Sequence, residues 1–332
     1  MRILIVITAV LSLLCGCAGK STVSKTPIVM NSNIPVYKTD TGIYFMKRGN
    51  EEDAHSLLMY EDDEGNQEII QKMPDQYGIV KSIYCCGNDL YYEYIDGQEK
   101  AHIFKCNIDT CENSELFSAE SDHLGETYVY AENEDIYYYG CGALWSYYHN
   151  SVEKEVLDSD SCIIGEDGIY YSINCSVYKK YFDGSVDECI ISKDDIFASK
   201  AALHRIQVTG GAVTVKNLIL NDDKIYFSLC DANEGGIGSK DILVFDMDNG
   251  LIDNVCEDIS AYSSFVIYND EIFTYGKDLK NGGYGLYKIE DDKHYELVKA
   301  DQKFWGIYAA DGYLYYYDTD GIILELRKIQ IS

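Results

Sequence analysis

Paired acidic residues in two predicted turns are the first candidates for chemistry. Asp246 and Asp248 lie in the segment DMDNG, and Asp318 and Asp320 lie in the segment DTDG. Carboxylate oxygens are the ligands that Ca²⁺ prefers, and each segment places two of them close together. Neither segment extends to a full twelve-residue calcium loop, and Asp-Gly is also the usual residue pair of a hairpin turn. The four aspartates are therefore weak calcium candidates, and no other cofactor is predicted.

Cysteines are the second group that could do chemistry. Ten of them follow Cys17, an even number that permits disulfides in an oxidising compartment. Cys106 and Cys111 flank a predicted hairpin loop and form the best disulfide candidate. The other cysteines lie mostly on predicted strands, where a free thiol packs as a small apolar side chain. The chain contains no Cys-x-x-Cys motif, so neither a redox pair nor a zinc ribbon is indicated.

Catalytic motifs are not evident. The chain has no Gly-x-Ser-x-Gly, no His-Glu-x-x-His and no phosphate loop, and its six histidines are dispersed. A glycosidase would need two carboxylates converging about 5–10 Å apart. With 56 acidic residues in the chain, the sequence does not single out such a pair. We therefore predict no catalytic residues and favour a binding protein over an enzyme.

The N-terminus has the pattern of an export signal. A basic start at Arg2 precedes a predominantly apolar run of twelve residues, Ile3 to Leu14, which is too short for a spanning helix and typical of a secretory signal. The following segment, LCGC, resembles a bacterial lipobox. This resemblance implies cleavage after residue 16 and attachment of the lipid to Cys17, with residues 17–26 as a flexible tether. Residues 27–332 then form a single domain.

A repeat organises that domain. An aliphatic residue recurs seven times after a short acidic or glycine-containing turn and before aromatic residues, as in DTGIYF, GNDLYYEY and DDKIYF. The aliphatic anchors, 33 to 56 residues apart, are Ile43, Leu90, Ile136, Ile169, Ile225, Ile272 and Leu314. Strand-like segments and turn signals surround each anchor. Four short strands in each of seven units indicate an all-β fold, a β-propeller of four-stranded blades. Seven blades are expected, with six or eight as alternatives.

Two further features concern the ring. The last unit is one strand short, so we expect the N-terminal segment Pro27–Asn31 to close the last blade, which removes exposed sheet edges. Deleting Lys25–Asn33 should then lower the melting temperature sharply.

The widest gap between anchors holds an insertion at about residues 193–216, with a predicted helix around Ile196–Arg205. Such an insertion is either functional or a decorative loop.

The cadence of the repeats also resembles known families. The segments EDGIYYSINCSVYKKYFDG (Glu166–Gly184) and DGYLYYYDTDG (Asp311–Gly321) resemble YWTD-like propellers, and more closely the DUF5050-type domain of bacterial lipoproteins. The resemblance covers nearly all of the chain after the tether. It implies a β-propeller and a lipoprotein, and it implies no particular ligand.

Charge narrows the class of partner. With 27 Lys and Arg against 56 Asp and Glu, the formal net charge is −29, which argues against binding nucleic acid.

The 31 tyrosines recur in every unit and are interpreted first as packing between blades, with an aromatic ligand platform as the alternative. We expect a monomeric lipoprotein on the outer side of a bacterial membrane, held there through Cys17. It would bind an envelope protein or a cell-wall glycan; the alternative is a glycan-directed hydrolase with clustered carboxylates at one face.

Overall fold

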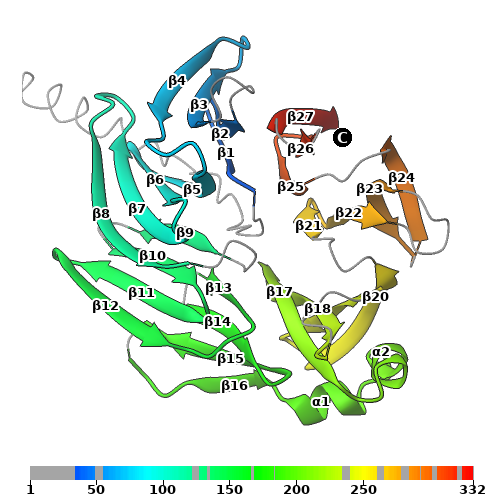
Figure 1. The fold of residues 1–332 in the computed structure, drawn as a ribbon. Helices are drawn as coiled ribbons and strands as arrows, with labels where there is room; N and C mark the ends of the chain where they lie inside the picture. The colour runs from blue at the N-terminus through cyan, green and yellow to red at the C-terminus, as the bar shows by residue number, and fades with distance from the viewer. Residues whose placement is uncertain are drawn as a thin grey trace, which may run out of the picture.

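Seven antiparallel sheets are arranged as blades around a central axis (Figure 1). The computed structural model describes residues 34–48, 55–121, 127–132, 135–165, 168–182, 184–233, 240–259, 265–277, 284–291, 293–300, 305–319 and 324–331. Within these residues, six blades have four strands and the last has three. The fold is the predicted seven-bladed β-propeller, not the six- or eight-bladed alternative.

The strands follow one another blade by blade. Blades 1 to 3 consist of β1 (Val36–Thr39), β2 (Gly42–Arg48), β3 (Ser56–Asp62) and β4 (Gln67–Lys72); β5 (Ile79–Cys86), β6 (Asp89–Ile95), β7 (Lys100–Asn107) and β8 (Asn113–Glu120); β9 (Tyr128–Glu132), β10 (Asp135–Gly140), β11 (Ala143–Tyr148) and β12 (Ser151–Val156). Blades 4 and 5 consist of β13 (Ser161–Gly165), β14 (Gly168–Ile173), β15 (Ser176–Tyr181) and β16 (Glu188–Ile191); β17 (Val213–Asn221), β18 (Lys224–Asp231), β19 (Lys240–Asp246) and β20 (Leu251–Ile259). Blades 6 and 7 consist of β21 (Phe265–Tyr268), β22 (Glu271–Lys277), β23 (Tyr284–Glu290) and β24 (Lys293–Ala300); β25 (Trp305–Ala310), β26 (Tyr313–Thr319) and β27 (Leu324–Gln330).

Each blade begins at the axis and is built outward. The first strands, from β1 to β25, lie nearest the centre of the ring in Figure 1, and each later strand pairs with the one before it. Because every blade repeats this order in the same chain direction, the seven turns between first and second strands emerge on the same face of the ring. We call this the first-turn face.

The repeated phrase occupies one register position in all blades. The seven anchors lie near the start of each second strand, and every one is buried. The residue after each anchor is aromatic and pairs with a residue on the innermost strand, as Tyr44 does with Tyr37 and Tyr91 with Tyr84. The turns before them use residues that tolerate a left-handed backbone, such as Asn269 and Asp311 with φ near 50°. Local turn chemistry and the repeat therefore set the same register.

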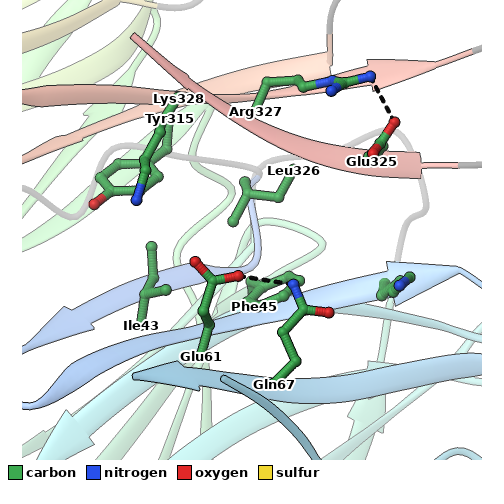
Figure 2. Close-up of a pocket in the computed structure, with 10 residues that line it drawn as sticks. Ile43, Phe45, Glu61, Gln67, Tyr315, Glu325, Leu326, Arg327 and Lys328 are labelled. Atoms are coloured by element: carbon green, nitrogen blue, oxygen red, sulfur yellow. Dashed lines mark hydrogen bonds and ion pairs between the residues drawn. The ribbon is translucent and has the colours of Figure 1, made fainter. Parts of the chain in front are cut away.

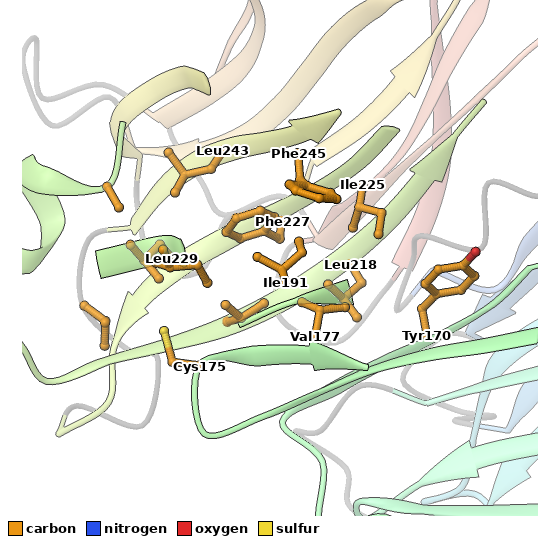
Figure 3. Packing of buried hydrophobic residues seen from close by; sticks show 14 of the residues in the cluster. Tyr170, Cys175, Val177, Ile191, Leu218, Ile225, Phe227, Leu229, Leu243 and Phe245 are labelled. Carbon is orange, nitrogen blue, oxygen red and sulfur yellow. The ribbon is translucent and has the colours of Figure 1, made fainter. Parts of the chain in front are cut away.

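Seven apolar clusters fill the spaces between neighbouring blades. Figure 3 shows the one between blades 4 and 5, where Val177 and Ile191 pack against Phe227, Leu229 and Leu243. Both faces of a blade are covered in this way, so the second strands need not alternate between polar and apolar residues. In β6 and β14 all but one residue are buried. The prediction that the tyrosine-rich phrases pack between blades is confirmed for these positions.

Blades 7 and 1 meet through side chains as well. Tyr317 on β26 is fully buried against blade 1, and its Oη accepts the Met46 N–H at 3.0 Å. The same Oη lies 2.8 Å from the carbonyl oxygen of Met46 and 3.2 Å from that of Pro35, either of which can accept its proton. Ile34 also packs closely on Gly306 at the start of β25. The expected strand at Pro27–Asn31 lies outside the described residues.

The insertion contains two short helices in place of the single predicted one. α1 (Lys193–Ala198) begins at Ser192, which forms a capping box with Asp195, and α2 (Leu203–Val208) follows. Between them, Ser199 has an extended backbone that ends the first helix. Ile196 and Ala202 join the apolar cluster between blades 4 and 5, which fixes both helices to the outer part of the ring (Figure 1).

Candidate functional site

The innermost strands differ between the two halves of the ring. The position two residues before the end of each first strand pairs with the aromatic residue after the anchor. In chain order this position is occupied by Tyr37, Tyr84, Tyr130, Ile163, Ile219, Val266 and Tyr308. The four tyrosines belong to consecutive blades, 7, 1, 2 and 3, because the ring closes between blades 7 and 1. Half of the ring therefore presents aromatic rings at the first-turn face, and the other half presents aliphatic side chains.

From Tyr37 onward, the tyrosines form a continuous series of ring contacts. The ring centroids of Tyr37 and Tyr84 are 5.4 Å apart in an edge-to-face arrangement, and those of Tyr84 and Tyr130 are 5.1 Å apart. Tyr130 continues to Tyr137 at 6.3 Å, and Tyr137 to Phe182 at 5.4 Å. These separations fall in the range of favourable aromatic pairs. These contacts run from blade 1 to blade 4, and Tyr308 of blade 7 lies beside blade 1, where its Oη is 3.2 Å from the Lys38 nitrogen. We call Tyr308, Tyr37, Tyr84, Tyr130, Tyr137 and Phe182 the tyrosine arc.

The arc is more accessible than its aliphatic counterparts. Tyr37, Tyr84 and Tyr308 are half-buried, and Phe182 at the end of the arc is 39% exposed, whereas Tyr130 between them is buried. Ile163, Ile219 and Val266, by contrast, are completely buried. The arc therefore offers partly exposed aromatic faces at one face of the ring, a surface on which a ligand can stack.

The hydroxyl groups of the arc serve binding better than catalysis. The Tyr308 Oη accepts the Lys38 N–H at 3.2 Å, and the Tyr37 hydroxyl donates to the carbonyl oxygen of Cys85 at 3.3 Å. Burial raises the pKa of Tyr308 to about 12 and raises the pKa of Tyr37 as well. Both hydroxyls stay neutral near pH 7, so neither acts as a base there.

Acidic residues are common on the first-turn face. The first turns of the blades carry acidic residues in every unit, and the described ones include Asp40, Asp89, Asp135, Asp222, Asp223, Asp270 and Asp311. The ammonium group of Lys38 lies 3.3 Å from both Asp63 and Asp311. A face with this charge repels phosphate groups and other anions and tolerates neutral or cationic ones.

One buried carboxyl has the raised pKa that an acid catalyst requires. Burial raises the pKa of Glu93, which is completely buried and lies near Lys81. Its oxygens accept hydrogen bonds from the Thr127 hydroxyl at 2.7 Å and the Tyr138 hydroxyl at 2.9 Å. A substrate has no access to this buried group, so Glu93 does not support the hydrolase alternative. Its hydrogen bonds instead connect blade 2 to blade 3.

A second cluster of ionisable groups lies at the insertion, away from the axis. His204 and Arg205 of α2 meet Asp241 of β19 and Asp258 of β20. In the part of the chain that the structure describes, His204, Asp241 and Asp258 are the one group of His, Cys, Asp or Glu side chains close enough to share a metal ion. Sequence spacing could not reveal it, because its members come from three separate elements.

A groove marks the meeting of blades 7 and 1. Figure 2 shows Leu326 of β27 facing Ile43 and Phe45 of β2 across it. Its polar residues are paired in part, since Arg327 contacts Glu325 at 2.7 Å and the Gln67 amide donates to Glu61 at 2.7 Å. The groove combines both charges with apolar side chains and indicates no particular ligand class.

The predicted calcium residues belong neither to the tyrosine arc nor to the ionisable cluster around His204. The Asp246 carboxylate accepts the N–H groups of Asp248 and Asn249 at 3.0 and 3.2 Å, as a turn-forming residue does. Asp318 lies 4.0 Å from Arg327, and Asp320 lies outside the described residues. Calcium binding at these aspartates stays a prediction.

The predicted cysteine sites are placed only in part. Cys106 is buried and Cys111 is exposed, on opposite sides of the β7–β8 turn, and both thiols are free in this structure. Their pairing stays a prediction for the oxidised protein. Cys17, the predicted lipidation site, lies outside the described residues.

Comparison with known proteins supports the fold. No protein-family model matches the chain, and no curated protein sequence matches it. Among solved structures, the β-propeller domain of the Trilobed protease from Pyrococcus furiosus, which has an open velcro topology, is similar with a TM-score of 0.58 and 10% identity. The match covers 90% of this chain and 96% of that one.

Larger proteins contain similar domains. The acylaminoacyl peptidase of Pyrococcus horikoshii matches with a TM-score of 0.53 and 12% identity over 91% of this chain and 54% of its own. The extracellular domain of the one component system BT4673 from B. thetaiotaomicron matches with a TM-score of 0.52 and 11% identity over 90% of this chain and 40% of its own. At these identities the likeness establishes the β-propeller fold.

None of the helices in the described part of the chain has the length and apolar character needed to span a bilayer.

Proposed function

We propose that this protein is a lipid-anchored binding module on the outer side of a bacterial membrane, and that its tyrosine arc is the ligand-contacting surface. The observation that carries the proposal is the difference between the two halves of the inner ring. Packing alone is satisfied by Ile163, Ile219 and Val266 at the equivalent positions, all completely buried. In the other half Tyr37, Tyr84 and Tyr308 are half-buried, whereas Tyr130 is buried. The three half-buried tyrosines therefore have a second role, and stacking against a ligand is the role that suits partly exposed aromatic faces.

The anchoring rests on the N-terminal sequence. The predominantly apolar run that ends in LCGC resembles a lipoprotein signal, and the repeats resemble DUF5050-type lipoprotein domains. The similarity to an extracellular domain of BT4673 agrees with a location outside the cytoplasm. The full chain has a net charge of −29 and is repelled by anionic lipid, so the acyl chains on Cys17 would provide the attachment.

The charge of the first-turn face restricts the ligand. Acidic residues such as Asp40 and Asp311 lie next to the arc, and they disfavour nucleic acid and other polyanions. Sugar rings and protein side chains both stack on tyrosine faces. We therefore propose a cell-wall glycan or an envelope protein as the partner of a monomeric propeller.

The arc is tested by removing its rings. Full-length protein in detergent is applied to a glycan array and to an extract of envelope proteins, and the partner found is measured by titration. We expect Tyr37→Ala and Tyr84→Ala to weaken binding at least tenfold, since aromatic anchors dominate such interfaces. Tyr295→Ala, on the outermost strand of blade 6 and also exposed, is the matched control and should bind as the wild type does. Unchanged binding by variants that melt at the wild-type temperature would refute the proposal.

The anchor is tested independently of the ligand. Mass spectrometry of the intact protein should show the mass of the lipid on the wild type and on Cys15→Ala, and Cys17→Ala should lack it. A wild-type protein without this mass, or a Cys17→Ala protein that retains it, would exclude lipidation at this residue.

A further inference from the structure

The insertion brings a histidine to two aspartates at the edge of blade 5. His204 Nδ1 lies 3.0 Å from Asp241 Oδ2, and His204 Nε2 lies 3.6 Å from Asp258 Oδ2. One ligand atom from each of the three residues can be chosen so that all lie within 4.8 Å of one another. α2, β19 and β20 each contribute one of them, so the group exists only when the insertion is packed against the blade.

Arg205 binds one oxygen of each carboxylate and leaves the other oxygen near His204. Its Nη2 bonds Oδ1 of Asp241 at 2.5 Å and Oδ1 of Asp258 at 3.0 Å. The Oδ2 atoms of both aspartates are left on the side of His204. Arg205 is 1% exposed, so the guanidinium holds the two carboxylates from beneath. Hydrogen-bonded carboxylates of this kind are typical of metal ligands whose orientation is set by an outer partner.

We propose that His204, Asp241 and Asp258 form a binding site for a divalent transition metal of the zinc class. One ring nitrogen of His204 and the two Oδ2 atoms would supply three ligands, with Arg205 orienting the carboxylates. Imidazole nitrogen with carboxylate oxygen suits zinc and its neighbours, whereas calcium prefers oxygen ligands alone. This site is separate from the tyrosine arc and does not depend on the proposed function.

Charge and access both favour an ion at this position. When His204 is neutral, the two carboxylates and the guanidinium give the group a net charge of −1. Glu257, which precedes Asp258 in the sequence, is also acidic. The His204 side chain is 30% exposed and that of Asp258 is 36% exposed, whereas Asp241 is completely buried. An ion can therefore enter from solvent, and water can occupy its remaining positions.

Metal binding would tie the insertion to the blade. Besides this cluster, apolar packing that includes Ile196 and Ala202 holds α1 and α2. Three hydrogen bonds add to it: the Lys193 N–H donates to Ser176 Oγ at 2.9 Å, the Ser199 hydroxyl to the Ile252 carbonyl oxygen at 3.4 Å, and the Asn254 amide to the Ala201 carbonyl oxygen at 3.4 Å. An ion bridging α2, β19 and β20 adds a contact present only in the folded state. It should raise the melting temperature as its concentration exceeds the dissociation constant.

The test uses full-length protein freed of metal by chelation and titrated with Zn²⁺. We expect one ion per chain by calorimetry, a higher melting temperature, and a visible absorption spectrum of low-coordinate Co²⁺ when Co²⁺ replaces Zn²⁺. His204→Ala and Asp258→Asn should each weaken binding at least tenfold, as the loss of one of three ligands requires. His149→Ala removes an exposed histidine on the β11–β12 turn and should bind as the wild type does.

Each outcome decides the proposal. Absence of one-to-one binding overturns it, and so does binding that both ligand variants retain, which would mark these four residues as an ion-pair network only. Melting curves recorded without metal identify any variant that fails to fold. If His204→Ala is such a variant, Asp258→Asn decides the test, because Asp258 is half-exposed.

Discussion

The innermost strands of the two halves of the ring share a register and differ in residue type at one position in each blade. In blades 7, 1, 2 and 3 the residue that faces the aromatic partner is tyrosine, and in blades 4, 5 and 6 it is isoleucine or valine. The partner itself is aromatic throughout, from Tyr44 to Tyr315, and buried in all blades except blade 3. The difference teaches that packing between blades rests on the anchors and their aromatic neighbours, which are shared by both halves. The inner tyrosines are additional, and three of the four, Tyr37, Tyr84 and Tyr308, keep part of their surface exposed.

The largest effect should come from the shared positions and should be equal in both halves. Leu90 in blade 2 and Ile225 in blade 5 are both completely buried anchors. Truncating either to alanine leaves a cavity, so we expect Leu90→Ala and Ile225→Ala each to lower the free energy of unfolding by about 2–5 kcal/mol. Urea denaturation measures both. A much smaller loss in one half would show that its blades do not depend on the anchor.

Exchanging the inner residue should affect the aliphatic half next most strongly. Val266 is completely buried between Ile307, Leu286 and their neighbours. Val266→Tyr inserts a ring where no space is left, so it should lower the free energy of unfolding by about 1–3 kcal/mol. Val266→Ile is the control with a smaller addition. If Val266→Tyr were as stable as the wild type, the aliphatic half could also accommodate inner tyrosines, and packing would not explain the difference between the halves.

The pH dependence of stability should distinguish the halves through Glu93. At this register position Glu93 of blade 2 corresponds to Ser228 of blade 5, and both are completely buried. Because burial raises the pKa of Glu93, the folded state binds a proton more tightly than the unfolded state, whose pKa is near 4.5. The resulting stabilisation is full below pH 4.5 and is lost as the pH rises through the folded pKa. Glu93→Gln should flatten that decline, at most about 1.4 kcal/mol per pH unit, and Ser228→Ala should leave it unchanged. Denaturation curves from pH 4 to 8 measure it; an identical slope in Glu93→Gln and wild type would contradict the assignment.

The smallest effect concerns the seam inside the tyrosine half. Tyr317→Phe keeps the buried ring between blades 7 and 1 but removes the hydroxyl that accepts the Met46 N–H. The Met46 N–H retains a bond to the Pro35 carbonyl at 3.1 Å, so we expect a loss of about 1 kcal/mol. Tyr295→Phe, on an exposed outer strand, should change stability by less than about 0.5 kcal/mol. A Tyr317→Phe protein as stable as the wild type would show that the seam depends on the ring alone.

Much of the fold follows from local sequence. The seven anchors from Ile43 to Leu314, each after a turn and before an aromatic residue, predict blade number and register, because turn chemistry and strand periodicity act over a few neighbouring residues. The same local rules account for one error. They predict a single helix around Ile196–Arg205, whereas the burial of Ile196 and Ala202 in one cluster and the extended Ser199 divide the segment into two.

Local sequence is enough to define the repeat, the acidic turns and the tyrosine-rich strands. Which tyrosines are buried between blades, and which stay accessible at the first-turn face as Tyr37 and Tyr84 do, depends on the folded ring. The tertiary structure alone brings His204 to Asp241 and Asp258, residues 37 and more positions away in the chain. The physical reason is that burial and long-range contacts depend on closure of the ring and docking of the insertion, which no local pattern encodes.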